Sequence, residues 1–329
     1  MSLTDAQSTT GQLLEFYRAM RLVREAEERL GALFADGEIP GFIHLSIGQE
    51  AVSVGVAAAL EKNDTLASNH RGHGHAIAKG LELDRFFLEV FGKQDGYCRG
   101  RGGSMHVADL SIGMLGANGI VGAGLSIAVG SALAHKLRGT GQIAVVFFGD
   151  GAIAEGVLHE SLNLAQLWTL PVLFVCENNG WSEFTESARQ LATDPQRMAA
   201  AYKMCALNVD GNDVVAVAAA ARNAVAQIRA GEGPCLLECR TKRVRGHFEG
   251  DAQKYRDASD LAMAAHSDPL TRCEAQLIAT GTRQPVIDKI NAEIKKRIDA
   301  AVAAARAGAP PAPADAVADV YTVSRELSS

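Results

Sequence analysis

Two short apolar runs separated by one helical segment constrain the fold of this chain more than any other feature. Residues 143–148 and 171–176 are uninterrupted apolar runs of strand length, and residues 155–168 between them carry apolar side chains at helical spacing. Residues 234–240 are predicted to form a third strand. Strands that are apolar throughout are buried on both faces, and strands that alternate with helices pair in parallel. The pattern therefore predicts an α/β protein with a parallel sheet and helices on both faces.

The rest of the chain predicts further helices around this centre. They are expected at residues 13–34, 49–60, 82–91, 121–137 and 213–229, from 194 onward, and through the C-terminal portion up to 307. The glycine-rich residues 92–119 are expected to form a long ordered loop. We therefore predict three parts, which are a flexible N-terminus (1–12), a single α/β domain (13–307) and a Pro/Ala-rich tail (308–329).

Composition excludes several classes of protein. With 47% hydrophobic and 21% charged residues, the chain is expected to fold around a large core rather than remain disordered. A net charge of -6 argues against a general nucleic-acid or anionic-membrane surface. Residues 113–134 carry no charge, yet their six glycines, with Asn118, Ser126 and Ser131, make them too polar and too weakly helical for a membrane span.

The cysteines and the N-terminus bear on the cell compartment. The six cysteines contain no CxxC pair and are interpreted as buried thiols in a reducing compartment. The first residues have neither a basic start nor an apolar stretch, so they do not resemble a signal peptide. We therefore expect a cytoplasmic protein.

Oxygen-bearing side chains follow two of the predicted strands. Gly149-Asp150-Gly151 ends the first apolar run, and Asn179 follows the second, 29 residues after Asp150. Because the carboxyl ends of parallel strands meet at one edge of the sheet, the two side chains are expected to lie together. One carboxylate and one amide are too few ligands for a calcium cage but suit Mg²⁺ that shares its shell with phosphates. The alternative for the Gly-Asp-Gly segment alone is an ordinary turn.

Two basic segments are candidates for anion binding. Residues 68–75 contain three histidines around Arg71, and residues 240–247 contain arginines, a lysine and His247. A zinc site is disfavoured because the arginine would repel a metal and no cysteine or acidic residue lies nearby. Arginine and histidine together suit diphosphate oxygens. Solvated basic loops are the alternative. The residues thus predict a Mg²⁺-diphosphate site without identifying the molecule that carries the diphosphate.

Several stretches resemble one protein family. Gly149-Asp150-Gly151 followed by Asn178-Asn179 resembles the thiamine-diphosphate motif, and residues 12–305 resemble the α subunit of the first component of 2-oxo acid dehydrogenase complexes. The matching stretches are HLSIGQEA (44–51), NHRGHGHAIAKG (69–80), GRGGSMH (100–106), NGIVGAG (118–124), GDGAIAEG (149–156), NLAQLWTLPVLFVCENNGW (163–181) and RVRGHFEGDAQKYR (243–256). Within the family, the GHFEGD and NNGWSEFT segments are most similar to acetoin-cleaving members.

The resemblance implies roles for individual residues. Mg²⁺ would be held by Asp150, Asn179 and the carbonyl of Trp181. The cofactor would contact His70, Arg71, Gly119, Val121, Gly149, Asp150, Gly151, Ala152, Asn179, Trp181 and His247. Three histidines are candidate catalytic residues: His44, His73 and His247, of which His44 and His73 would face the reacting thiazolium carbon. His70 and Trp181 depart from the tyrosines usual in pyruvate members, and Phe248 replaces the regulatory serine of animal pyruvate enzymes.

The resemblance also implies partners and a reaction. The glutamate that protonates the cofactor's pyrimidine comes from a β subunit in this family, so an α₂β₂ heterotetramer is expected. The enzyme would cleave acetoin and pass the two-carbon acyl unit to a lipoyl-bearing acyltransferase component; the alternative substrates are pyruvate and branched-chain 2-oxo acids. Two other classes are weaker. A nicotinamide-dependent oxidoreductase is disfavoured because no strand runs into Gly122 and Gly124, and a silent regulatory paralogue is disfavoured because the site residues are intact.

Overall fold

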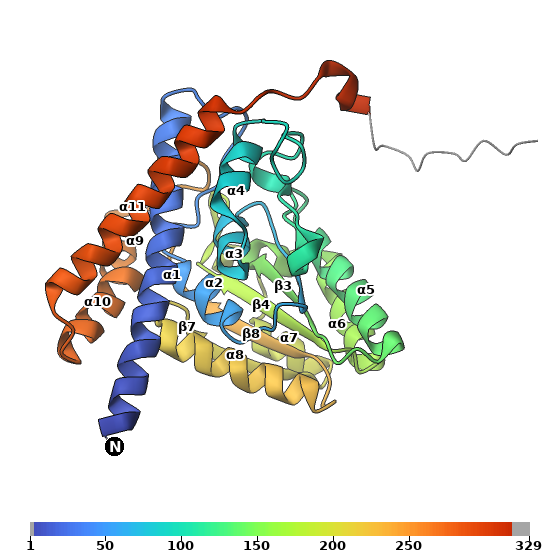
Figure 1. Ribbon diagram of the computed structural model, residues 1–329. Helices are drawn as coiled ribbons and strands as arrows, with labels where there is room; N and C mark the ends of the chain where they lie inside the picture. Colours follow the sequence, from blue (N-terminus) through green and yellow to red (C-terminus); the bar gives the residue numbers. More distant parts are fainter. Residues whose placement is uncertain (1–2, 318–329) are drawn as a thin grey trace, which may run out of the picture.

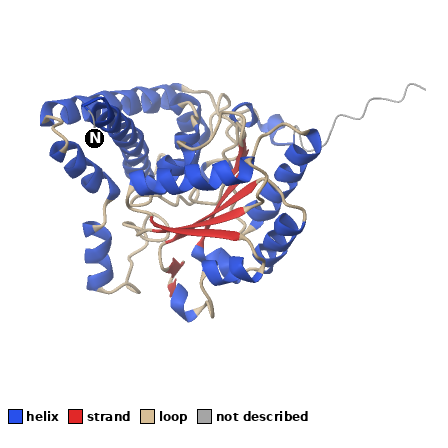
Figure 2. Ribbon diagram, turned by 90° about the horizontal axis from the view of Figure 1, so that it is seen from below, coloured by secondary structure: helices blue, strands red, loops and turns tan. Residues whose placement is uncertain are grey.

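A computed structural model describes residues 3–317 and contains a six-stranded sheet in which every pair of neighbouring strands is parallel. The order across the sheet is β2-β1-β3-β4-β8-β7. The strands are β1 (Thr65–Ala67), β2 (Met114–Gly116), β3 (Ala144–Gly149), β4 (Val172–Asn178), β7 (Cys205–Asp210) and β8 (Cys235–Arg240). Figure 2 shows helices on both sides of this sheet, as the apolar strands predict.

Alternate residues of each central strand enter two different cores. Val145 and Phe147 of β3 pack in one core, and Val146 and Phe148 pack in the other. The first core also contains side chains of α1 (Leu3–Ala35), α2 (Glu50–Ala57), α3 (His73–Lys79), α4 (Leu83–Val90), α8 (Val214–Arg229), α10 (Pro269–Ala279) and α11 (Gln284–Ala307). The second contains α5 (Ala123–Arg138), α6 (Gly156–Leu167) and α7 (Pro195–Ala201). The predicted fold class is thus confirmed.

The two ends of the chain meet along a pair of long helices. α1 and α11, blue and red in Figure 1, contact each other and cover the first core. α1 begins at Leu3, so residues 3–12, which we expected to be flexible, are helical. The expected tail from residue 308 has a short 3₁₀ turn at Pro313–Val317, and residues 318–329 lie outside the described residues.

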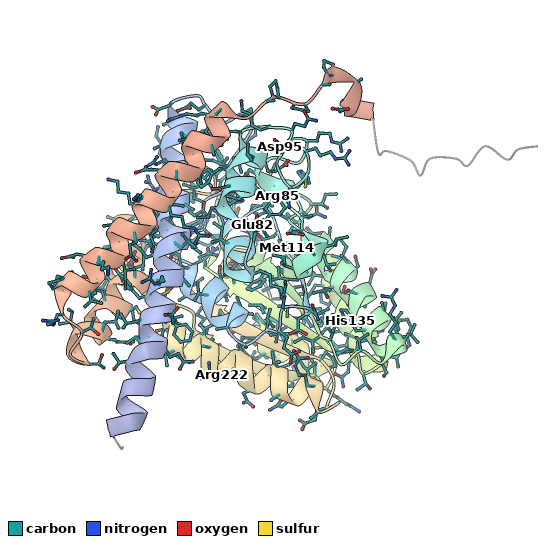
Figure 3. The ribbon with its side chains drawn as sticks, viewed as in Figure 1. Glu82, Arg85, Asp95, Met114, His135 and Arg222 are labelled. Atoms are coloured by element: carbon teal, nitrogen blue, oxygen red, sulfur yellow. The ribbon has the colours of Figure 1, made fainter. Side chains whose placement is uncertain are left out.

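Several short elements were not predicted. They are β1, β2, β7, α3, the hairpin β5 (Trp181–Ser182) and β6 (Thr185–Glu186), α9 (Ala258–His266) as a separate helix, and the 3₁₀ turns η1 (Ser104–His106), η2 (Leu110–Ile112), η3 (Asp150–Ala154) and η4 (Ser187–Arg189). The segment 92–119 is otherwise the expected loop. It begins beside α4, where the Arg85 guanidinium lies 4.2 Å from the centre of the Tyr97 ring (Figure 3 labels Arg85 and Asp95).

One helix bears on the question of membrane insertion and of assembly. No helix among residues 3–317 is long and apolar enough to cross a membrane. Small residues recur every four positions at the start of α5 and along it, at Gly122, Ser126 and Gly130. Gly122 packs against Val157, 2.8 Å from the position of a Cβ. Ser126 and Gly130 are exposed, and a Cβ built on Gly130 would have no heavy atom of the described residues within 4 Å. Ser126 and Gly130 therefore lie on a free surface of the described chain.

Candidate active site

A cavity of about 230 Å³ lies at the carboxyl ends of the four central strands. Residues after β1 (68–71), β3 (150–152), β4 (179–183) and β8 (243 and 247) all line it. These strands are adjacent in the sheet, and the β3–β4 register pairs Gly149 with Glu177. The cavity thus occupies the position that a parallel sheet offers to a ligand.

All but one of the residues predicted for the site line this cavity. Those that line it are His44, His70, Arg71, Gly119, Val121, Gly149, Asp150, Gly151, Ala152, Asn179, Trp181 and His247. They come from segments as far apart as residues 44 and 247, so the fold gathers in one place what the sequence only suggests. Their roles toward a ligand stay predictions.

Asp150 presents one free carboxylate oxygen to the site. The residue is 1% exposed, its Oδ2 accepts a hydrogen bond from the Ser187 hydroxyl, and its Oδ1 is buried without a hydrogen-bond partner in the structure. Burial raises the pKa of this carboxyl to about 6, while the Ser187 hydroxyl and nearby N–H groups act in the opposite direction. A buried anionic oxygen without a partner is costly. A divalent cation bound at Oδ1 would satisfy it.

Asn179 and Trp181 stand beside Asp150 on the loop after β4. Asn179 Oδ1 accepts the backbone N–H of Trp181 at 3.1 Å, and its Nδ2 donates to Gln49 Oε1 at 3.1 Å. These bonds fix which end of the amide carries the oxygen, and that oxygen keeps a second lone pair. The Trp181 indole donates to Asp260 at 3.0 Å, which holds the loop in place. The donor set is one carboxylate, one amide and backbone carbonyls, which is typical of Mg²⁺ ligands.

Two buried arginines give the cavity its positive charge. Arg71 donates to the carbonyls of Leu45 (2.7 Å) and His247 (3.0 Å), and Arg243 donates to the Tyr255 hydroxyl (2.8 Å). Within residues 3–317, neither guanidinium pairs with a carboxylate, and Arg243 Nε has no partner. Burial, and secondarily Arg243, lowers the pKa of Arg71 to about 9, so it remains charged at neutral pH. Two buried cations without bonded counterions favour an anionic ligand.

Three histidines whose imidazole rings are neutral at pH 7 also line the cavity: His44, His70 and His247. Burial is the largest cause that lowers the pKa of His44 to about 4, of His70 to about 2 and of His247 to about 3, and Arg71 is the next. One ring nitrogen from each lies within 4.8 Å of those of the other two. The two arginines beside them disfavour a metal ion at this point.

The hydrogen bonds of His247 determine which ring nitrogen carries its proton. Its Nδ1 lies 3.2 Å from Arg243 Nη1 and 3.5 Å from Arg71 Nη2. Guanidinium nitrogens only donate, so Nδ1 accepts, and a neutral ring then carries its proton on Nε2. His44 differs, because its Nδ1 is buried without a partner. The cavity therefore contains a histidine that donates from Nε2 and another with a free ring nitrogen.

The structure corrects the expectation that His73 faces the reacting centre. His73 is 1% exposed and does not line the cavity. Its Nδ1 bonds to Glu27 at 2.9 Å, and its Nε2 bonds to the Ser104 hydroxyl at 2.8 Å. His73 is the first residue of α3, whereas His70 lies in the turn before the helix, so the helical period does not relate the two side chains although both belong to one motif. Its position is that of a core residue joining α1, α3 and the loop.

Sequence reasoning missed residues that the long loops bring to the site. Arg243 was counted only as one charge among several, although it is 1% exposed and lines the cavity while Arg240 is exposed. Ser187 had no signal at all, because it follows a hairpin that no pattern predicts. Glu177 lines the cavity and bonds to His75 at 3.1 Å. Its position directly after an apolar run was the one signal available.

The fold and the cavity together define an α/β protein whose strand ends hold a cavity lined by two buried arginines and one buried carboxylate. Comparison with known proteins identifies the family: the chain belongs to the dehydrogenase E1 component family, whose model matches residues 18–314. It is accordingly a component of a thiamine-diphosphate-dependent oxidoreductase.

Relatives of the chain are similar over almost their whole length. The α subunit of acetoin:2,6-dichlorophenolindophenol oxidoreductase from Cupriavidus necator is 47% identical over 94% of this chain and 94% of its own. The Bacillus subtilis protein of the same description is 44% identical over 98% and 95%. The pyruvate dehydrogenase E1 component subunit α of Zymomonas mobilis is 40% identical over 94% and 88%.

Proposed function

We propose that this chain is the α subunit of an enzyme that uses thiamine diphosphate and Mg²⁺ to cleave acetoin and passes the two-carbon acyl unit to a lipoyl carrier. The observation that carries the proposal is the cavity itself. Two buried arginines without carboxylate partners line it, and so does Asp150, whose Oδ1 has no hydrogen-bond partner. A diphosphate would pair with the arginines, and a divalent cation would pair with the carboxylate.

The ligand set follows from these positions. Asp150, Asn179 and the Trp181 carbonyl would hold Mg²⁺, and Arg71 and His247 would bind the diphosphate together with His70. Gly149 would leave room for the phosphates close to the backbone, because a Cβ built on it meets no heavy atom within 4 Å, whereas a Cβ on Gly151 would lie 2.6 Å from the Ser182 hydroxyl. Gly151 and Ala152 would contact the cofactor, and Gly119 and Val121 would lie against the aminopyrimidine. The bound cofactor supplies the electron sink for cleavage of the carbon–carbon bond.

The chain's own residues would orient the substrate and move protons. His247 donates from Nε2 because two guanidinium groups hold its Nδ1 as an acceptor. His44 is neutral at pH 7, since burial lowers its pKa to about 4, and it has a ring nitrogen free to accept a proton. We therefore retain His44 and His247 as catalytic candidates and withdraw His73.

Acetoin is favoured over pyruvate by the relatives. The two that are 47% and 44% identical are described as acetoin oxidoreductase subunits, and the one at 40% as a pyruvate dehydrogenase subunit. Pyruvate and branched-chain 2-oxo acids are the second candidate. The phrase "subunit alpha" in these descriptions supports a β subunit, and we propose an α₂β₂ heterotetramer with a lipoyl-bearing acyltransferase as the next component.

Domain organisation and location complete the proposal. Residues 13–307 are proposed to form one domain, because helices from both ends of the chain share its first core. All six cysteines are free thiols in the structure, which supports a reducing, cytoplasmic location.

The test compares substrates directly. The chain is co-purified with its β subunit, and the reduction of a dye is followed with acetoin, pyruvate and branched 2-oxo acids in separate assays. Acetoin is expected to give the highest kcat/KM. Activity on pyruvate alone would contradict the substrate assignment, and no activity on any of them, with cofactor and Mg²⁺ present, would contradict the proposed function.

A further inference from the structure

Ser187 is a buried residue beside the proposed cation site that none of the roles above uses. It is 8% exposed and begins the turn η4, just after the hairpin β5–β6. Its hydroxyl donates a hydrogen bond to Asp150 Oδ2. Its backbone N–H donates to the carbonyl of Gly180 at 3.0 Å. One residue is thus bonded to both segments that would supply cation ligands, the turn after β3 and the loop after β4.

The hydroxyl bond selects the orientation of the Asp150 carboxylate. The last torsion of an aspartate side chain is broad, so packing alone does not fix where its two oxygens point. Ser187 engages Oδ2, and the other oxygen, Oδ1, is the buried atom without a partner. The serine therefore leaves one oxygen free and determines which one it is.

The hydrogen bond from the Ser187 backbone N–H acts on the loop after β4. The carbonyl that accepts from Ser187 belongs to Gly180, which precedes Trp181 and has a φ of +83°, in the left-handed region that favours glycine. The peptide joining these two residues is held from the other end as well, because Asn179 Oδ1 accepts the Trp181 N–H at 3.1 Å. Ser187 thus helps to fix the peptide next to the proposed carbonyl ligand.

We infer that Ser187 is a positioning residue for the divalent cation, which it serves by aiming Asp150 Oδ1 and fixing the loop at Gly180. The inference rests on the proposed function, because it takes the cation site as given. Ser187 does not line the cavity, so it acts through Asp150 and the loop rather than by touching cofactor or substrate. A serine that only stabilised the fold would contribute to stability and leave cation affinity unchanged.

The experiment measures cation affinity. Mn²⁺ replaces Mg²⁺, and its binding to the full-length chain, co-purified with the β subunit and saturated with thiamine diphosphate, is followed by electron paramagnetic resonance. Ser187→Ala is expected to weaken Mn²⁺ binding about tenfold, as the loss of a hydrogen bond to a charged group predicts. Ser187→Thr keeps a hydroxyl and is expected to bind within about threefold of the wild type.

A matched control separates positioning from stability. Ser46 is also buried and donates to a buried carboxylate, Glu27, at 2.6 Å, but Glu27, unlike Asp150, does not line the cavity. Ser46→Ala is expected to lower the melting temperature and leave Mn²⁺ affinity unchanged. The inference on Ser187 would be overturned, without affecting the proposed function, by either of two results. One is a Ser187→Ala variant that binds Mn²⁺ as tightly as the wild type, and the other is an equal loss of Mn²⁺ affinity in Ser187→Ala and Ser187→Thr. Failure of the wild-type complex to bind Mn²⁺ at all would instead overturn the proposed function.

Discussion

At the scale of single residues, His44, His70 and His247 share one cavity with two arginines and are held neutral by burial and by those charges. Each has a pKa in the folded chain below its ordinary value near 6.5. The unfolded chain therefore binds more protons than the folded chain once the pH falls below about 6.5, and stability falls with it. The loss continues down to the folded-state pKa values, about 4 for His44 and lower for the other two.

This linkage predicts the behaviour of His70→Tyr, which removes one titrating imidazole. Between pH 7 and pH 5, the melting temperature of the cofactor-free wild type is expected to fall, and that of His70→Tyr to fall less steeply. Differential scanning fluorimetry measures both. His159 is exposed on α6, so His159→Tyr should keep the wild-type slope. Parallel curves for His70→Tyr and the wild type would contradict this account of the cavity.

Among elements, the loop after α4 depends on one buried carboxylate. Glu89 is 0% exposed, and its two oxygens accept four backbone N–H groups at 2.6–2.9 Å. The donors are Cys98, Gly100, Gly102 and Gly103. The next residues are Ser104, which bonds to His73, and Met105, which lines the cavity. Glu89 therefore links α4, which starts after Glu82 and carries the exposed Arg85 (both labelled in Figure 3), to the rim of the site.

Glu89→Gln replaces one acceptor oxygen with an NH₂ group that faces N–H donors. Unfolding is expected to become easier by about 3 kcal/mol, because a charged acceptor is lost and buried donors lose their partner. Protease cleavage within residues 96–103 should become faster. Chemical denaturation and mass spectrometry of the cleavage products measure the two effects. Asp84→Asn, at an exposed position of the same helix, is the control and should match the wild type. An unchanged cleavage pattern in Glu89→Gln would exclude this anchoring role.

Strands that are buried on both faces could be predicted from the sequence, whereas short or half-exposed strands could not. β3, β4 and β8 are buried on both faces, so their apolar runs were visible in the sequence, and so was the meeting of Asp150 with Asn179 at their ends. β7 is a half-exposed edge strand with the sequence CALNVD, and β1 and β2 have three residues each, so none shows a run. Arg243 and Ser187 reach the site on long loops, where no periodicity relates a residue to its neighbours in space.

For the whole molecule, the described chain leaves a surface on α5 that is suited to a partner. Ile127 of α5 is 46% exposed, Ile120 and Val121 just before α5 are 72% and 48% exposed, and Gly130 lies on an open face of α5. Val121 also lines the cavity, so a protein bound on this surface would approach the site. We propose that the β subunit covers it.

Gly130→Phe tests this assembly. The chain is expected to fold at least as stably as the wild type, because a helical glycine is replaced at a position where a Cβ would have no heavy atom of the described residues within 4 Å. Association with the β subunit should be lost, and dye reduction with it, as size-exclusion chromatography and the activity assay would show. Ala226→Phe, exposed on α8 near Arg222 (Figure 3), should assemble normally. If the Gly130→Phe chain still formed a heterotetramer as stable as that of the wild type, the interface with the β subunit would lie elsewhere.

The central claim is that Asp150 and Asn179, delivered to one edge by consecutive strands, hold a cation that secures the diphosphate. The most direct measurement is a calorimetric titration of thiamine diphosphate into the α/β complex, with Mg²⁺ and with a chelator, for the wild type and Asp150→Asn. Tight binding is predicted only for the wild type with Mg²⁺, and Asp150→Asn should bind at least about tenfold more weakly, which corresponds to about 1.4 kcal/mol. Equal affinity in Asp150→Asn, or no effect of the chelator, would contradict the claim.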